Sequence, residues 1–145
     1  MNSDSESIGR VIKAANSARK NAYAPYSNFT VGAGLLTREG NIYQGSNIEN
    51  ASYGLTVCAE RVAVFKAVSR GDDELLSLAV ITGEDYYVTP CGACLQVLKE
   101  FSDDMEIILV KNMEEYKLKT LKELLPEAFD GKTIYRSQEE REGDV

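Results

Sequence analysis

The chain has 145 residues, a formal net charge of −7 and no histidine. The lack of histidine excludes a Ser-His-Asp triad, a Cys-His nucleophile pair and any zinc site with an imidazole ligand. The excess of acidic side chains disfavours polyanionic partners, because nucleic-acid affinity comes largely from neutralising phosphates. We therefore expect a small neutral or weakly charged ligand, and no nucleic-acid polymer.

Hydrophobic periodicity and turn signals divide the chain into nine expected elements. In chain order these are a helix over 5–21, strands over 29–37 and 42–48, a helix over 58–69, a strand over 75–81, a helix over 91–101, strands over 106–110 and 116–119, and a helix over 121–125. We expect Ser3 or Ser5 to cap the first helix. The turn residues 38–41 predict a hairpin between the first two strands.

This order of elements predicts an α/β fold in which helices cover one mixed sheet. The hairpin contributes antiparallel pairing, and the helical crossovers contribute parallel pairing. The length is that of one domain, so we expect residues 1–145 to form a single unit. The start has no signal-peptide pattern, and no apolar run approaches the roughly 20 residues that span a bilayer. We therefore expect a soluble, cytoplasmic protein with no membrane partner.

All three cysteines stand where a loop is expected to pass into a helix. Cys91 and Cys94 are three residues apart, so at the start of a helix they share one face, which is the usual spacing of a zinc-chelating pair. Cys58 opens another helix and offers a third thiolate. Helix N-termini lower thiol pKa values through backbone N–H groups and the helix dipole. Three protein ligands leave the fourth tetrahedral position open, as in catalytic zinc sites.

Glu60 lies two residues after Cys58, where it can stand beside a metal without coordinating it. A carboxylate there can take a proton from a water whose pKa zinc has lowered toward about 7, and pass it on. Each part has a plainer interpretation. Cys91 and Cys94 alone suit a redox dithiol, Cys58 alone suits the core, and Glu60 alone suits a solvated helix face. The joint pattern favours zinc chemistry.

Two segments, Cys58-Ala59-Glu60-Arg61 and Pro90-Cys91-Gly92-Ala93-Cys94, resemble the small zinc-dependent cytidine deaminases of pyrimidine nucleoside salvage. Further matching segments are Asn28–Ala33, Asn47–Gly54, Leu124–Pro126 and Phe129. The resemblance implies a cytidine-deaminase-like three-layer α-β-α sandwich around a mixed five-stranded sheet. It places the catalytic core at about 22–129 and leaves a polar C-terminal tail at 136–145.

The resemblance implies a hydrolase that converts cytidine and 2′-deoxycytidine to uridine and 2′-deoxyuridine with release of ammonia. Cys58, Cys91 and Cys94 would hold one Zn²⁺ per subunit. Glu60 would be the catalytic proton shuttle, taking the water proton and protonating first N3 and then the departing amino group. A modified cytosine nucleoside of the blasticidin S type is an alternative substrate that shares the same zinc ligands.

The resemblance also implies contacts with the nucleoside and between subunits. The residues matched to nucleoside-binding positions are Phe29, Asn47, Glu49, Ala59 and Pro90. The residues matched to positions that enter a neighbouring subunit's site are Ala51, Tyr53 and Phe129, and the family commonly forms homotetramers. Apart from the motif, Asn47 and Glu49 suit a polar turn and Phe29 suits the core.

Zinc with three thiolates carries a formal charge of −1, which opposes lowering the pKa of a water. Family members offset this charge with helix dipoles and with arginines hydrogen-bonded to the sulfurs, and Arg61 matches one of these arginines. The other usually follows the second cysteine of the pair, where this chain has Leu95. The plainer interpretation is that Leu95 packs on an apolar surface.

A function from a different class is compatible with the same cysteines. A non-catalytic, zinc-stabilised binding module would need a fourth protein ligand, and Glu60 is the best placed carboxylate. Editing of RNA or DNA would need a channel with basic and aromatic side chains. The acidic composition argues against such a channel, and so do the two basic and four acidic residues of the segment 136–145.

Overall fold

The computed structural model describes residues 4–132 and residue 134. Its elements are α1 (Ser5–Arg19), β1 (Val31–Thr37), β2 (Ile42–Ser46), the short 3₁₀ helix η1 (Tyr53–Leu55), α2 (Ala59–Ser69), β3 (Leu75–Thr82), α3 (Gly92–Phe101), β4 (Glu106–Val110), β5 (Tyr116–Thr120) and α4 (Leu121–Leu124). All nine expected elements are present, and none of their ends differs by more than two residues. The helix η1 was not expected, because three residues carry no periodicity.

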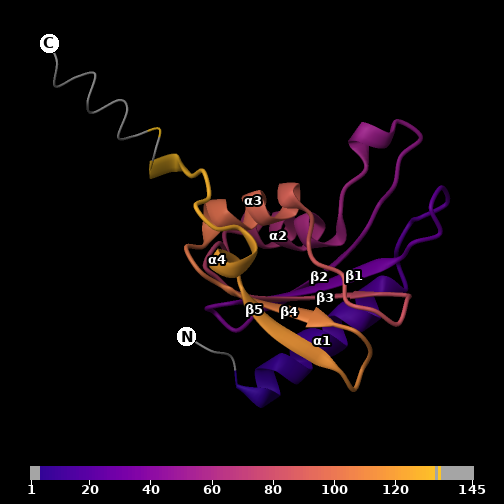
Figure 1. Ribbon diagram of the computed structural model, residues 1–145, viewed down its shortest axis with the longest axis horizontal. Coiled ribbons are helices and arrows are strands. Elements are labelled where there is room, and N and C mark those ends of the chain that lie inside the picture. Colours follow the sequence, from indigo (N-terminus) through magenta and orange to yellow (C-terminus); the bar gives the residue numbers. More distant parts are fainter. Residues whose placement is uncertain (1–3, 133, 135–145) are drawn as a thin grey trace, which may run out of the picture.

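The five strands form one mixed sheet in the order β2-β1-β3-β4-β5. Strand β1 pairs antiparallel with β2 and β3, whereas β3 pairs parallel with β4 and β4 antiparallel with β5. Helix α1 covers one face of the sheet, and α2, α3 and α4 lie on the other (Figure 1). The expected three-layer sandwich is therefore confirmed, and the parallel pair is joined through α3 as a helical crossover.

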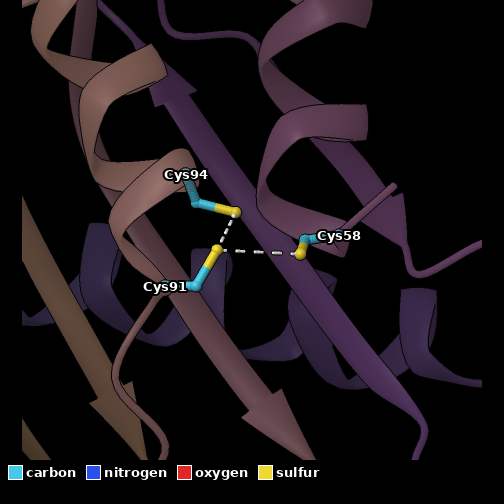
Figure 2. A group of neighbouring side chains, drawn as sticks. All are labelled: Cys58, Cys91 and Cys94. Carbon is cyan, nitrogen blue, oxygen red and sulfur yellow. Dashed lines mark hydrogen bonds between the residues drawn. The ribbon is translucent and has the colours of Figure 1, made fainter. Parts of the chain in front are cut away.

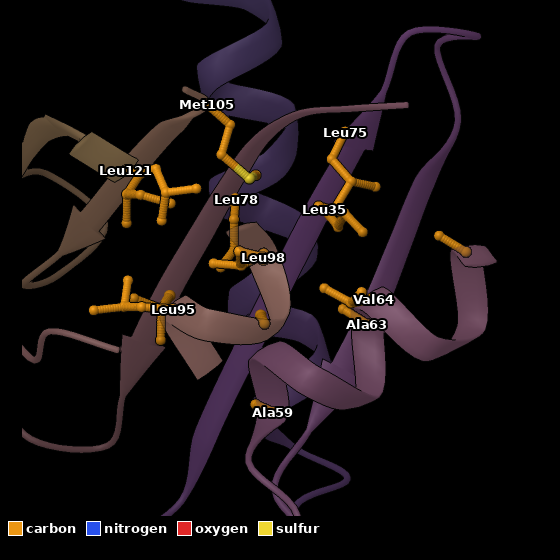
Figure 3. Close-up of a cluster of buried hydrophobic side chains, with 14 of the residues drawn as sticks. Leu35, Ala59, Ala63, Val64, Leu75, Leu78, Leu95, Leu98, Met105 and Leu121 are labelled. Carbon is orange, nitrogen blue, oxygen red and sulfur yellow. The ribbon is translucent and has the colours of Figure 1, made fainter. Parts of the chain in front are cut away.

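The core lies on both faces of the sheet, which is why β3 and β4 read as nearly continuous apolar runs. Between the sheet and the helices α2 and α3, the fully buried side chains include Leu35, Leu78 and Leu98 (Figure 3). Leu95 belongs to this cluster with only 4% of its surface exposed. The plainer interpretation of Leu95 as a packing residue is confirmed by this burial.

The start of α2 lies directly against β2 at Gly45. A Cβ atom at Gly45 would stand 2.1 Å from the carbonyl oxygen of Ala59 and 2.6 Å from the backbone nitrogen of Ala63. Only glycine permits this approach between the strand and the helix. Because Ala59 stands between Cys58 and Glu60, the contact sets where both of these side chains lie relative to the sheet.

Helix α1 is capped by Asp4, whose carboxylate accepts a hydrogen bond from the backbone N–H of Ser7 at 2.7 Å. The expectation of Ser5 as the cap was wrong, because Ser5 is already the first helical residue. Ser3 and the polar tail 136–145 lie outside the described residues. Among the helices of residues 4–132, none combines the length and the apolar character that crossing a bilayer requires.

Candidate metal centre

Three thiols converge between the starts of α2 and α3 (Figure 2). The Sγ atom of Cys91 lies 3.4 Å from that of Cys94 and 4.0 Å from that of Cys58, and all three sulfurs lie within 4.8 Å of one another. A tetrahedral site with Zn–S bonds of about 2.3 Å places its sulfurs about 3.8 Å apart. The spacing fits zinc and is far longer than a disulfide bond of about 2.05 Å.

The cysteines occupy defined positions on the two helices. Cys58 is the N-cap residue of α2 and Cys91 that of α3, both with extended backbone. Their carbonyl oxygens accept the first helical hydrogen bonds, but within the described chain neither side chain makes a capping bond. Each sulfur is therefore available to a metal while the helix dipole favours its thiolate form.

Arg61 stabilises one of these sulfurs, as the resemblance implies. Its Nη2 atom donates to the Sγ atom of Cys58 at 3.4 Å. Hydrogen bonds from the Cys94 thiol and from Arg61 lower the pKa of Cys58. The pKa of Cys94 is raised, because its thiol proton is held by the Cys58 thiolate and because the side chain is buried. The site thus favours negative charge on Cys58 even without a metal.

Glu60 is buried beside the cysteines, with 5% of its surface exposed. Burial raises the pKa of this carboxyl group to about 7, and the charge on Cys58 adds to the effect. Among the described residues, the cluster of potential metal ligands holds the three sulfurs and does not include Glu60. The carboxylate therefore lies close to the site without closing it, which disfavours the structural zinc module that needs it as a fourth ligand.

Two projecting loops, 20–30 and 47–58, lie side by side at one end of the sheet (Figure 1). The backbone of Tyr23 bonds to Asn47 at 2.9 Å and to Glu49 at 2.8 Å. Between those two residues, Ile48 exchanges two backbone hydrogen bonds of 3.0 Å with Val57. Since Val57 precedes Cys58, this pairing holds Asn47 and Glu49 next to the start of α2.

The side chain of Glu49 is held by the first loop, and that of Asn47 by the end of this loop and the start of β1. The Asn47 amide accepts from the backbone N–H of Val31 at 2.9 Å and donates to the carbonyl oxygen of Phe29 at 2.8 Å. The Glu49 carboxylate accepts from the Ser27 hydroxyl and from the backbone N–H groups of Tyr26 and Ser27. The Ser27 hydroxyl and these N–H groups lower the pKa of Glu49.

Ser27 is a further residue of this arrangement, and no sequence motif indicated it. Its hydroxyl both donates to Glu49 and accepts from the backbone N–H of Phe29 at 3.0 Å. The signal available in the sequence was the turn that contains it, where Asn28 adopts a left-handed φ of 58°. Asparagine is one of the few residues that adopt this conformation readily, so the turn was recognisable but its partner, Glu49, was not.

The remaining expected site residues differ in their burial. Ala59 and Pro90 are buried, and Phe29 is half-buried against the core. The three residues assigned to a subunit boundary are exposed in the single chain, Tyr53 to 77% and Phe129 to 60%. The Tyr53 ring packs edge-on against Tyr26 with centroids 6.1 Å apart. Gln96 of α3 donates to the Phe129 carbonyl oxygen at 2.8 Å.

Comparisons with known proteins agree with this chemistry. Residues 5–111 match the family model described as the cytidine and deoxycytidylate deaminase zinc-binding region. The chain is 48% identical to a cytidine deaminase of Halalkalibacterium halodurans over 120 residues, which are 82% of this chain and 91% of the relative. It is 42% identical to a cytidine deaminase of Sporosarcina psychrophila over 134 residues, which are 92% of this chain and 98% of the relative.

A solved structure shares the architecture as well. The crystal structure of cytidine deaminase from Burkholderia pseudomallei superimposes with a TM-score of 0.79 and is 44% identical in sequence. The match covers 83% of this chain and 97% of that one. The similarity therefore extends over nearly the whole length of that protein, beyond the cysteine motifs alone.

Proposed function

Because this chain belongs to the zinc-dependent cytidine deaminase family, we propose which of its side chains perform the family's reaction. The chain catalyses the hydrolytic deamination of cytidine with zinc as its cofactor. Water adds across the N3–C4 bond of the base, the bond from C4 to the amino nitrogen breaks, and uridine and ammonia are released. The proposal extends the substrates to 2′-deoxycytidine.

The roles follow from where the side chains lie. Cys58, Cys91 and Cys94 would hold zinc, which when bound supplies the Lewis acid that activates water for attack on C4. Glu60 accepts the proton that the water loses and delivers it to N3. It then carries the proton of the new C4 hydroxyl to the departing amino group. The observation that carries this assignment is a buried carboxylate beside three thiols that converge at two helix starts.

We assign the sugar to Asn47 and Glu49, and the base to Phe29 and the backbone of Ala59 and Pro90. Hydrogen-bond capacity supports the first part of this assignment. An amide nitrogen has two N–H donors, and among the described contacts Asn47 uses one of them. A carboxylate has about four acceptor positions, of which Glu49 uses three. One donor and one acceptor position therefore remain for ribose hydroxyls.

The overall function is tested by measuring zinc and deamination on the same sample. We expect one zinc per chain and a loss of cytidine absorbance as uridine forms. Cytidine, 2′-deoxycytidine and blasticidin S are compared by kcat/KM. A higher kcat/KM for blasticidin S would favour the modified-nucleoside alternative. Bound zinc without turnover of any of the three would favour the non-catalytic module, and reversible oxidation without metal would favour the redox dithiol.

Replacing Ser27 with alanine is expected to raise the KM for cytidine about tenfold, because a hydrogen bond to a charged group contributes about 1.5–3 kcal/mol. The variant leaves the Glu49 carboxylate with its two backbone donors but without the hydroxyl that orients it. The value of kcat should change by less than about twofold, since no proton moves through this residue. Steady-state kinetics on cytidine provide the measurement.

The matched control for this variant is Ser27→Thr, which keeps the hydroxyl. Its KM should return to within about threefold of the wild-type value, since the donor to Glu49 is preserved. A fall in kcat with KM unchanged in Ser27→Ala would show that Glu49 is not a ground-state ribose contact. Thermal unfolding of both variants separates loss of the loop from loss of the contact.

We further propose that the chain forms a homotetramer in which Ala51, Tyr53 and Phe129 enter a neighbouring subunit's site. An apolar groove of about 490 Å³ supports this assembly, and its walls include Ile48, Leu55 and Phe65. Leu55 is 66% exposed and Phe65 is 48% exposed in the single chain. Contiguous exposed apolar surface of this kind marks interaction sites. The Gln96 contact anchors the Phe129 backbone and leaves its ring outward.

A charge placed in this groove is expected to dissociate the assembly. In Leu55→Glu the carboxylate would have to be buried between subunits without a partner, which costs several kcal/mol. Light scattering coupled to size exclusion should show four chains for the wild type and fewer for the variant. Met113→Glu is the matched control, since Met113 is 52% exposed in the β4–β5 turn. Equal dissociation by both variants would contradict the assignment of the interface.

We place the protein in the cytoplasm, in the salvage of pyrimidine nucleosides. We treat residues 1–145 as a single catalytic domain, with its core at about 22–129.

A further inference from the structure

A second groove, of about 780 Å³, lies at the β2 edge of the sheet, away from the cysteines. Its walls are two helices on opposite faces of the sheet, with β2 between them. Helix α1 contributes Arg10 and Lys13, and the C-terminal end of α2 contributes Lys66 and Arg70. Four cations thus face one cavity from two directions, in a chain whose net charge is −7.

These cations are not neutralised by neighbouring acids. Within residues 4–132 and 134, none of the four lies within 4.0 Å of a carboxylate oxygen. The carboxylate of Asp4 influences Arg10 only at longer range, and Glu39 influences Tyr43 in the groove wall. No carboxylate belongs to the described lining of the groove.

Asp72 lies behind the groove wall and accepts three hydrogen bonds at one of its carboxylate oxygens. The Tyr43 hydroxyl donates to the Asp72 carboxylate at 3.0 Å, and the side chains of Thr37 and Asn41 donate to the same carboxylate at 2.8 and 2.9 Å. These bonds hold Asp72 on the side of Thr37 and Asn41, and it is not part of the groove lining. The charged side chains that line the groove are therefore all cations, and the Asp72 carboxylate lies behind the Tyr43 hydroxyl as a partial countercharge.

The free edge of β2 is closed to an added strand. Lys66 donates to the outward carbonyl oxygen of Gln44 at 2.7 Å, and the Gln44 side chain donates to the carbonyl oxygen of Ala14 at 3.2 Å. The Lys66 contact occupies a β2 carbonyl group that a paired strand would need, and the Gln44 contact ties β2 to α1 beside it. A peptide bound by strand addition is therefore not the expected occupant.

We propose that this groove binds a small polyphosphate anion. A compact polyphosphate carries enough charge to meet four cations from two helices, and Ser17 and Ser69 in the lining supply further donors. A long nucleic acid would extend beyond the groove along a chain whose net charge is −7, which repels it. The phosphate chain is shared by inorganic tripolyphosphate and by nucleoside triphosphates. The ring of Tyr43 gives a nucleoside an apolar surface to contact.

The test is calorimetric titration of the full-length protein with sodium tripolyphosphate and, separately, with ATP, at about 50 mM salt where electrostatic binding is strong. The groove variant is Arg10→Gln combined with Lys13→Gln. The matched control is Lys117→Gln combined with Lys122→Gln, which removes the same charge near β5, the opposite edge of the sheet. We expect one tripolyphosphate per chain, and a dissociation constant that rises about tenfold or more in the groove variant alone.

Tighter binding of ATP than of tripolyphosphate supports the proposal and places a nucleoside on the Tyr43 wall, and equal binding supports it with the phosphate chain as the sole determinant. If neither anion binds, or if the control variant loses as much affinity for tripolyphosphate as the groove variant, the proposal is overturned. The kcat/KM for cytidine should stay within about twofold of the wild-type value in both variants. None of the substituted residues, Arg10, Lys13, Lys117 and Lys122, is among those assigned to the active site. The groove and the proposed function can therefore fail independently.

Discussion

Replacing Glu60 with glutamine is expected to lower kcat for cytidine by about 10²–10⁴-fold, the usual contribution of a positioned general acid–base group. Glutamine keeps the size of the side chain and its hydrogen-bonding ability but cannot carry a proton. Zinc should stay at one per chain, because Glu60 is not part of the three-sulfur cluster. Steady-state kinetics and metal analysis on the same preparation measure both quantities.

The matched control is Glu100→Gln, which removes a carboxylate from the exposed face of α3. Its kcat should stay within about twofold of the wild-type value, as is usual for surface substitutions. If Glu60→Gln turned over cytidine at the wild-type rate, the proton-shuttle role would be refuted. If it instead lost zinc, Glu60 would be a ligand and the site a closed one.

Replacing Cys91 with serine is expected to abolish deamination and reduce bound zinc well below one per chain. Cys91 is the right cysteine to change because its side chain is exposed, whereas Cys94 is fully buried and its removal would also leave a cavity. A metal that binds only the folded chain stabilises it, by about 2.7 kcal/mol when free zinc is 100 times its dissociation constant. Added zinc should therefore raise the unfolding temperature of the wild type and leave Cys91→Ser nearly unchanged.

The wild type stripped of zinc by a chelator provides the control for this variant. Its activity and its zinc-dependent stability should both return when zinc is restored, while those of Cys91→Ser should not. Recovery of full activity by the variant would mean that two cysteines suffice, contrary to the spacing of the three sulfurs. Loss of activity with zinc fully retained would make Cys91 something other than a ligand.

The two motifs were recognisable because their information is local. Cys91 and Cys94 share a face through helical spacing alone, and Arg61 follows Cys58 at the distance that lets it reach the sulfur. The element order was equally local, since alternating apolar and turn signals recur over a few residues. This is why the expected helices and strands matched the structure to within two residues at their ends.

Other features depended on contacts between distant parts of the chain. Ser27 of the first projecting loop meets Glu49 of the second across 22 residues. The basic groove at the β2 edge combines residues from α1, β2 and α2, so no single segment of the sequence displays it. Side-chain partners of this kind follow from sheet order and packing, which periodicity does not specify.

By itself the sequence determined the chemical nature of the site. With no histidine and three cysteines available, a zinc site had to rest on thiolates, and a carboxylate had to carry the protons. Only the tertiary structure decided that Cys58 meets Cys91 across 33 residues, that Glu60 is buried beside them, and that Leu95 belongs to the core. The physical reason is that residue types set which bonds are possible, whereas close packing, such as that of α2 against Gly45, sets which atoms meet.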